Sequence, residues 1–203
     1  MSAVGPRRPD PPRPRPAWLA DAERLDLAVY AAIAATPSPA LDSAMGRLTR
    51  AADHSKLSLA AAAALAVFGG PDGRRAATSG LAAVGVTATI VNVGLKLVAR
   101  RPRPDPVTAA VPITRQVKMP VTRSFPSGHS AAAFAFATGV GDVLPGAAIP
   151  LRALASVVAY SRVHTGVHYP GDVIAGALVG VSLAELTGQV LRRRMPGRAR
   201  SSS

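Results

Sequence analysis

Residues 161–172 read Ser-Arg-Val-His-Thr-Gly-Val-His-Tyr-Pro-Gly-Asp and lie between two apolar runs, residues 147–160 and 173–191. Gly166 and Pro170 argue against a regular helix through this stretch, because proline lacks a backbone N–H and glycine favours turns. We therefore expect a polar turn between two apolar helices. The turn carries one arginine, two histidines and an aspartate, so it brings ionisable groups to one end of the helix pair.

Two further polar clusters also lie at the ends of apolar runs. Residues 96–104 read Lys-Leu-Val-Ala-Arg-Arg-Pro-Arg-Pro and close the run 78–98, whereas residues 125–129 read Phe-Pro-Ser-Gly-His and precede the run 130–144. If each run is a helix that crosses the same layer, the three clusters meet at one face. The sequence thus predicts a single site assembled from three separate segments.

The cationic residues of these clusters suit a phosphate group. A phosphoryl group in transfer spreads negative charge over its oxygens, so catalysis depends mainly on cations and N–H donors placed around it. Lys96, Arg103 and Arg162 are the predicted cationic ligands. Ser127 and Gly128 lie where a helix should begin, and helix N-termini present free N–H groups to anions. We therefore predict that these five residues bind phosphate.

The remaining polar residues supply a nucleophile and an acid. His168 is the predicted nucleophile, and Asp172, four residues later, can accept the proton of the other ring nitrogen and fix the attacking tautomer. His129 is then the general acid for the leaving group and later the base that activates water. A rival interpretation makes His164 and His168 metal ligands, but it leaves the arginines unexplained. We expect His164 to be structural and His54 to be a helix-end residue.

The ordered set Lys-x6-Arg-Pro, Pro-Ser-Gly-His and Ser-Arg-x5-His-x3-Asp resembles the type-2 phosphatidic-acid phosphatase superfamily, also called lipid phosphate phosphatases. Every catalytic position of the three motifs is matched, but residues 1–50 carry no match. The resemblance implies an all-α fold, a metal-independent reaction through a phosphohistidine without a cofactor, and lipid or polyprenyl phosphates as substrates. The superfamily also includes soluble acid phosphatases and vanadate-dependent haloperoxidases.

Composition favours a membrane protein. Of the 203 residues 48% are hydrophobic and only 4% aromatic, and apolar runs recur at 57–68, 78–98, 130–144, 147–160 and 173–191. Small residues allow close packing of membrane helices, and Gly176 and Gly180 are spaced for it. We predict an integral-membrane helical bundle of about five to six helices, forming a single domain over residues 17–191. The alternative is a soluble alanine-rich bundle.

The termini have a different composition. Residues 1–16 should form a disordered basic arm rich in proline and arginine, and residues 192–203 a disordered basic tail. Residues 17–35 are predicted to be an amphipathic helix that lies in the membrane interface or is partly inserted against the bundle, residues 40–52 a second such helix, and residues 72–75 a turn. The absence of cysteine excludes disulfides and thiol chemistry.

These features predict a lipid phosphatase in the bacterial cytoplasmic membrane. Basic residues at 72–75 and 192–200 favour the cytoplasmic side for the end remote from the motifs, so the site should face outward. The expected substrates are polyprenyl diphosphates, phosphates or sugar phosphates of envelope synthesis, with phosphatidic acid or phosphatidylglycerophosphate as the alternative.

The net charge of +13 also permits a non-enzymatic protein that binds anionic membranes or nucleic acid. Anionic lipids are the simpler partner, because the sequence has no set of aromatic residues for stacking on bases. The sequence makes no prediction about oligomeric state.

Overall fold

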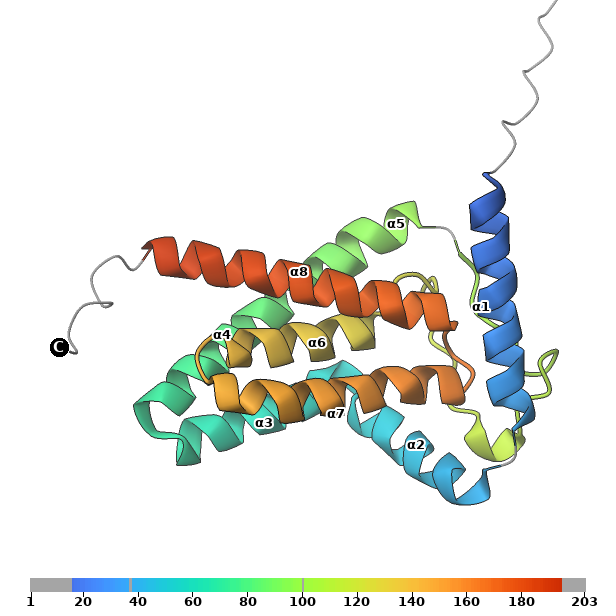
Figure 1. Cartoon of the computed structure of the whole chain (residues 1–203). Coiled ribbons are helices and arrows are strands. Elements are labelled where there is room, and N and C mark those ends of the chain that lie inside the picture. Colours follow the sequence, from blue (N-terminus) through green and yellow to red (C-terminus); the bar gives the residue numbers. More distant parts are fainter. Residues whose placement is uncertain (1–15, 37, 100, 195–203) are drawn as a thin grey trace, which may run out of the picture.

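The computed structural model describes residues 16–36, 38–99 and 101–194. Within these ranges the chain forms seven continuous helices and no strand, so the predicted all-α fold is confirmed (Figure 1). The predicted number of five to six helices was too low, because both N-terminal segments form full helices besides the five apolar runs. The predicted arm lies outside the described residues, apart from Pro16. The last helix continues to Arg194, so the predicted tail begins inside this helix and the rest of it lies outside the described residues.

The first two helices lie at one end of the molecule. Helix α1 (Ala17–Ala35) stands across that end, and α2 (Pro39–Ala51) leads back toward the bundle (Figure 1). Proline starts α2 because its fixed φ suits the first helical turn and its missing N–H would have no intrahelical acceptor there. Tyr30 and Ala34 are the buried residues of α1, and Tyr30 packs against the turn after residue 164.

A short turn, η1 (Asp53–Ser55), connects α2 to α3 (Lys56–Phe68). Helix α4 (Gly70–Thr89) continues through the π-helical segment η2 (Ile90–Leu95) into α5 (Lys96–Val98), which gives one helix of 29 residues. Residues 72–75 are therefore helical, and the predicted turn there is wrong. The chain reverses at Gly69 and Gly70 instead, where Gly70 has a φ of +60° that glycine adopts without a Cβ clash.

The C-terminal half forms the centre of the bundle. Helix α6 (Gly128–Gly141) packs against α4, α7 (Pro145–His164) and α8 (Pro170–Arg194). The approach of α8 to α6 requires glycine: a Cβ on Gly176 would lie 2.5 Å from the carbonyl oxygen of Ser127, and one on Gly180 would lie 2.2 Å from that of Ala131. The close packing that the glycine spacing predicted is thus confirmed for this helix pair.

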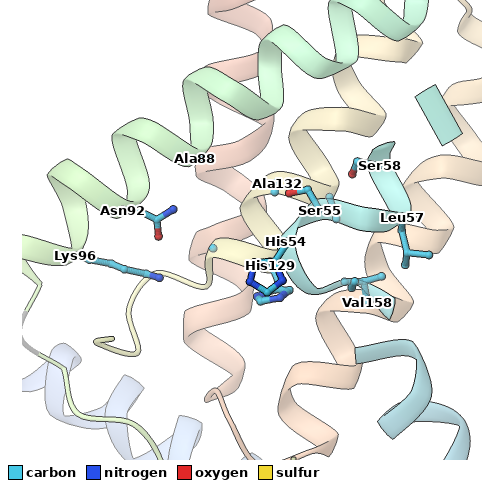
Figure 2. Close-up of a pocket in the computed structure, with 13 residues that line it drawn as sticks. His54, Ser55, Leu57, Ser58, Ala88, Asn92, Lys96, His129, Ala132 and Val158 are labelled. Atoms are coloured by element: carbon cyan, nitrogen blue, oxygen red, sulfur yellow. The ribbon is translucent and has the colours of Figure 1, made fainter. Parts of the chain in front are cut away.

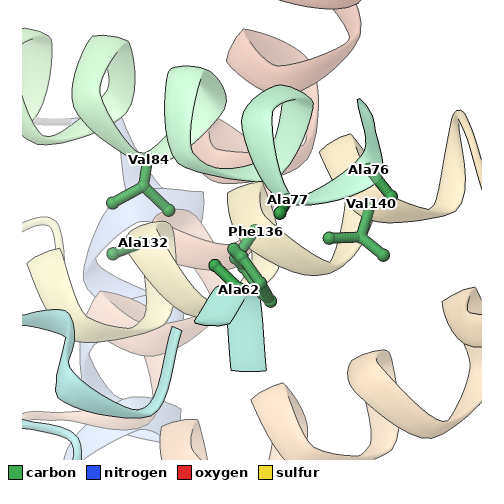
Figure 3. Close-up of a cluster of buried hydrophobic side chains, with 7 residues drawn as sticks. All are labelled: Ala62, Ala76, Ala77, Val84, Ala132, Phe136 and Val140. Carbon is green, nitrogen blue, oxygen red and sulfur yellow. The ribbon is translucent and has the colours of Figure 1, made fainter. Parts of the chain in front are cut away.

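The core of this bundle consists mainly of small side chains. One cluster joins α3, α4 and α6 through Phe136 and its neighbours, which are Ala62, Ala76, Ala77, Val84, Ala132 and Val140 (Figure 3). Larger apolar side chains, such as Phe68, Val93 and Leu178, point outward and are exposed. Small side chains inside and large apolar side chains outside suit a bundle surrounded by lipid. Among the described residues, Gly70–Val98 and Pro170–Arg193 are long and apolar enough to cross a membrane.

The end of the bundle that carries the motifs has a polar core. Arg115, in the short 3₁₀ helix η3 (Ile113–Arg115), is fully buried and donates through Nε to Asp42 at 2.7 Å. The same carboxylate oxygen lies 2.9 Å from Nε2 of His164. These contacts tie α2, the loop 101–127 and α7 together. His164 therefore has a structural partner close to the site, as the sequence analysis expected.

Candidate active site

The three clusters meet at the end of the bundle where α6 and α8 begin and α7 ends (Figure 1). His168 lies in the turn between α7 and α8, which begins after His164 and includes Gly166 with a φ of +76°. The imidazole is almost fully buried and its Nδ1 lies 3.4 Å from Oδ2 of Asp172. The expected irregular backbone is therefore present, and it orients His168 toward the interior.

The tautomer of His168 follows from its two neighbours. Nη1 of Arg103 lies 3.1 Å from Nε2, and a guanidinium can only donate, so Nε2 carries the lone pair and Nδ1 the proton. The Nδ1–H group then donates to Asp172. Burial is the main cause that lowers the pKa of His168 to about 4, and the positive charge of Arg103 acts in the same direction. The hydrogen bond that the ring donates to Asp172 opposes this shift. His168 is therefore neutral near pH 7, with the nucleophilic nitrogen directed at a cation.

Asp172 is held by more partners than the motif alone suggested. Its Oδ1 accepts from Nη1 of Arg101 at 3.0 Å, and its Oδ2 accepts from the backbone N–H of Tyr169 at 3.0 Å and from the hydroxyl of Ser124. Arg101 continues to Asp26 of α1 and lies 4.2 Å from the ring centre of Tyr169. The carboxylate is therefore fixed in position by contacts from three segments.

Arg101 and Ser124 were not predicted. Arg101 stands two residues before Arg103 in the first cluster, and the spacing gave no reason to separate their roles. The structure separates them, because Arg101 supports Asp172 whereas Arg103 reaches His168.

Arg103 is oriented by the loop that surrounds it. Its Nε donates to the carbonyl of Thr122 at 2.7 Å, and its Nη1 donates to the carbonyl of Val167 at 2.8 Å. Nη2 lies 3.1 Å from the hydroxyl of Thr122. Carbonyl acceptors hold the guanidinium without neutralising it, so its charge is available to an anion beside His168.

Arg162 and Lys96 approach from other helices. Arg162 is almost fully buried in α7, donates to the hydroxyl of Thr49 at 3.1 Å, and has an Nε without a partner among the described residues. A buried donor of this kind is costly unless it is satisfied, and an anion in the site would satisfy it. Lys96 places Nζ 3.5 Å from the hydroxyl of Thr122, and also 3.5 Å from where a Cβ on Gly128 would lie. The absence of a side chain at Gly128 leaves space beside this ammonium group.

Ser127 begins α6 as its N-cap. Its hydroxyl accepts from the N–H of Ser130 at 3.4 Å, and its own N–H donates to the carbonyl of Asp172 at 2.9 Å. The N–H groups of the first helical turn that follows have no acceptor within the helix. Ser127 thus connects the start of α6 to the start of α8 by a backbone hydrogen bond. Its assignment as a direct phosphate ligand stays a prediction.

His129 lies in the first turn of α6, and its Nε2 is 3.0 Å from Oδ1 of Asp53 in η1. This partner was missed, because Asp53 precedes the first motif, which begins at Lys96, and nothing in the spacing links η1 to α6. His54 was expected to be a helix-end residue, and it does stand in the turn before α3. It also lines the pocket beside His129 (Figure 2).

A pocket of about 180 Å³ opens at His129. Its polar wall includes Lys96, Asn92 and His54, and its apolar wall is formed by small and aliphatic side chains (Figure 2). A second pocket of about 30 Å³ continues between α3, α6 and α7 and shares four lining residues with the first, which are Leu57, Ser58, Ala133 and Val158. The first pocket is therefore polar beside His129 and Lys96 and leads into an apolar extension, whereas His168, Arg103 and Arg162 are not among the residues that line it.

Comparison with known proteins agrees with this geometry. The family model described as the PAP2 superfamily matches residues 76–196, which include all three motif clusters. The chain belongs to the PAP2 superfamily. The resemblance to type-2 phosphatidic-acid phosphatases is thereby confirmed, and residues 1–75, with α1 to α3, lie outside the matched region.

Relatives with assigned activities are similar over part or most of the chain. A decaprenylphosphoryl-5-phosphoribose phosphatase of Mycobacterium tuberculosis is 35% identical over 117 residues, which are 56% of this chain and 60% of that protein. The matched segment therefore spans less than two thirds of that relative. The protein of the same name from Mycolicibacterium smegmatis is 36% identical over 169 residues, 78% of this chain and 84% of that protein.

Two solved structures share the fold. A transmembrane PAP2-type phosphatidylglycerolphosphate phosphatase of Bacillus subtilis superposes with a TM-score of 0.65 at 26% identity, covering 89% of this chain and 90% of that one. The LpxE protein of Aquifex aeolicus gives a TM-score of 0.62 at 26% identity over 81% of this chain and 95% of that one. Together with the two long apolar helices and the outward-facing apolar side chains, these similarities identify an integral membrane protein.

Proposed function

We propose that this protein is a membrane-embedded lipid phosphatase that removes a phosphate group through a phosphohistidine. The observation that carries the proposal is the state of His168: a buried, neutral imidazole with Nδ1 on Asp172 and Nε2 directed at Arg103. This arrangement supplies a nucleophilic nitrogen next to a cation that is not neutralised by a carboxylate. A binding protein would have no need for a nucleophile held in one tautomer.

The proposed reaction has two steps. In the first, Nε2 of His168 bonds to phosphorus, the ester P–O bond breaks, and His129 gives a proton to the departing oxygen. In the second, His129 takes a proton from water, the water oxygen bonds to phosphorus, the N–P bond breaks and inorganic phosphate leaves. Asp172 stays ionised and holds the proton on Nδ1 of His168.

The proposed phosphate ligands are Lys96, Arg103, Arg162 and the N-terminus of α6 with Ser127 and Gly128. Four observations support this set: the free space at Gly128, the unpartnered Nε of Arg162, the carbonyl-held guanidinium of Arg103 and the position of Lys96 at the pocket wall. These groups are cations and N–H donors, which suit phosphate oxygens and would repel a metal ion. We therefore expect turnover without a metal or cofactor.

The substrate that we propose is a polyprenyl-linked phosphate, with a phosphorylated prenyl sugar as the leading candidate. The names of the two mycobacterial relatives support this class. The pocket also suits it, because Asn92, Lys96 and His54 line the part next to His129 and an apolar groove between α3, α6 and α7 continues from it. A sugar could occupy the polar part, and the prenyl chain could leave along the groove.

We further propose that the site faces the outside of the cytoplasmic membrane. The end of the bundle remote from the motifs carries Arg74 and Arg75 at the start of α4, and Arg192 and Arg193 at the end of α8. Basic residues at this end favour its placement in the cytoplasm.

The test is phosphate release by purified protein in detergent, with a chelator present. The substrates are a prenyl sugar phosphate, polyprenyl phosphate and diphosphate, phosphatidic acid and phosphatidylglycerophosphate. Wild-type protein should release phosphate and the His168→Ala variant should not. The preferred substrate ranks the candidate classes, and the phosphatidylglycerophosphate arm tests the activity named for the Bacillus structure. Equal release by both proteins would contradict a phosphohistidine, and a need for added metal would contradict the proposed chemistry.

A further inference from the structure

The turn η1 brings an additional carboxylate into the site. Asp53 lies with Oδ1 3.0 Å from Nε2 of His129 and 3.8 Å from Nη1 of Arg162. The next two residues, His54 and Ser55, have φ values of 56° and 58°, in the left-handed region that residues with a Cβ seldom occupy. This backbone places Asp53 against α6 and α7, although it belongs to the connection between α2 and α3.

We propose that Asp53 is a positioning residue for the proton transfers of His129, so that the site contains two His–Asp pairs with different tasks. The inference rests on the proposed phosphatase function. One pair, His168 and Asp172, prepares the nucleophile. The other, His129 and Asp53, prepares the acid that protonates the leaving group and the base that activates water.

The hydrogen bond decides which nitrogen of His129 does the chemistry. Because a carboxylate only accepts, Nε2 of His129 carries the proton that points to Asp53, and Nδ1 is the nitrogen available to the substrate. The protonated ring gives its Nδ1 proton to the departing ester oxygen, and the neutral ring then takes a proton from water at the same nitrogen. Asp53 keeps the Nε2–H bond and its negative charge through both steps.

The surrounding charges explain why a carboxylate is needed here. His129 must be an imidazolium before it can act as an acid, yet its burial, the main cause, and the positive charge of Arg162 disfavour this charged form. Asp53 faces both His129 and Arg162, so its negative charge offsets this repulsion. Without it, the ring would be neutral more often and would meet the ester oxygen in a less suitable orientation.

The two pairs differ in exposure in a way that fits these tasks. The Asp172 side chain is 0% exposed, whereas the Asp53 side chain is 40% exposed. A nucleophile needs one fixed tautomer, which a buried carboxylate enforces. An acid and base that exchanges protons with a leaving group and with water needs access to solvent, and the pocket at His129 provides it.

The test uses two phosphate monoesters whose leaving groups differ in their need for a proton. Decyl phosphate loses an alkoxide and requires an acid, whereas p-nitrophenyl phosphate loses a stabilised phenolate and does not. The ratio kcat/KM covers the steps up to formation of the phosphohistidine. For Asp53→Asn we expect kcat/KM to fall about 10- to 100-fold with decyl phosphate and less than about threefold with p-nitrophenyl phosphate.

Two further variants complete the experiment. Asp72→Asn is the matched control, because Asp72 is also an exposed carboxylate paired with an arginine, Arg75, but it lies at the remote end of α4. This control should behave as wild type with both substrates. Asp53→Glu keeps the carboxylate and should recover most of the loss with decyl phosphate, and it provides a second measurement if Asp53→Asn does not fold.

The outcomes separate the inference from the function on which it rests. Equal losses with both substrates would mean that Asp53 only holds the fold together, and unchanged kinetics would mean that His129 acts without it; either result overturns the inference alone. If Asp53→Asn does not fold, a Glu variant with equal losses for both esters overturns it as well. Wild-type protein that releases phosphate from neither ester nor from any lipid would overturn the proposed function and this inference with it.

Discussion

The middle of the bundle and its polar end are stabilised by different kinds of interaction. In the middle, α4, α6 and α8 bring alanine and glycine into contact, while large apolar side chains such as Leu178 face outward. At the polar end, several fully buried side chains are ionisable, and Arg115, His168 and Asp172 each meet a partner from a distant segment. The comparison shows that one protein can combine a region held together by close backbone packing with a region held together by paired charges.

The two regions should therefore tolerate different kinds of substitution. A larger side chain in the middle forces two helices apart, whereas the loss of a single charge at the polar end leaves its partner buried and unpaired. Predictions about activity therefore concern the polar end alone, and predictions about stability concern both.

The largest effect is expected at the nucleophile. His168→Ala removes the nitrogen that we propose bonds to phosphorus, so turnover should fall by about 10⁴-fold or more. Trapping with a ³²P-labelled substrate should yield an acid-labile phosphoenzyme from wild type and none from the variant. Label retained by the variant would place the nucleophile elsewhere in the polar end.

Asp172→Asn should lower kcat by about 10²- to 10⁴-fold, because an amide cannot hold the proton on Nδ1 of His168 as a carboxylate does. KM should change little, since Asp172 contacts the imidazole and Arg101 rather than the pocket. A large rise in KM with an unchanged kcat would assign Asp172 to substrate binding. Steady-state kinetics on the preferred lipid substrate provide both numbers.

Arg115→Ala tests the buried charges of the polar end without touching the reacting groups. The variant removes the guanidinium that pairs with the buried Asp42, which keeps its contact with His164, and it leaves the carbonyl of Ile33 without this donor. The free energy of unfolding should therefore fall by about 3–5 kcal/mol. Arg192→Ala, which breaks an exposed pair with Asp142, is the control and should cost about 0–1 kcal/mol. Thermal unfolding in detergent gives the difference. Equal costs would show that burial does not distinguish the two pairs.

Gly180→Val tests the middle of the bundle. A Cβ at this position would lie 2.2 Å from the carbonyl oxygen of Ala131, so α8 and α6 must separate, at a cost of about 1–3 kcal/mol. Gly85→Val in α4 is the matched control, because nothing lies within 4 Å of the corresponding Cβ. A destabilisation of Gly85→Val as large as that of Gly180→Val would show that helix propensity, rather than close contact, accounts for the loss.

The smallest effect is the acid limb of the pH profile. Burial lowers the pKa of His168 to about 4, so the ring stays neutral as the pH falls from 7 to 5 and becomes protonated only below about 4. We expect kcat/KM of the free enzyme to lose activity from His168 only in that lower range, by about tenfold per pH unit. A profile without an inflection below pH 5 would contradict this expectation. An inflection near pH 6.5 that moves on mutation of Arg103 would likewise show that His168 is more exposed to solvent than the structure has it.

The expected helices match the structure where hydrophobic runs are long. The runs 57–68 and 173–191 correspond to α3 and α8, and the range 17–35 coincides with α1. The turn expected at 72–75 was wrong because polar residues were taken as the chain reversal, whereas the reversal is made by Gly69 and Gly70. Charged residues in a first helical turn are compatible with a helix, and periodicity alone does not reveal this.

The residues of the candidate site likewise fall into those that the sequence predicted and those that only the structure revealed. The motif spacing predicted that His168, Asp172, His129 and Arg103 belong together, because a four-residue separation or a shared helix end brings side chains close. The spacing could not predict Asp53, which lies 76 residues from His129 in the chain. Arg101 was likewise indistinguishable from its neighbours until the structure placed it on Asp172.

The sequence by itself determined the all-helical class through the resemblance of its motifs to a known family, and the membrane character through the length of its apolar runs. It also determined the residues that gather at one end, because local spacing acts over short distances along the chain. Only the tertiary structure decided which carboxylate meets which imidazole, with Asp172 on His168, Asp42 on His164 and Asp53 on His129. The physical reason is that a buried charge needs a partner of opposite sign within hydrogen-bond reach, and this partner can come from any segment that the fold brings to the same place.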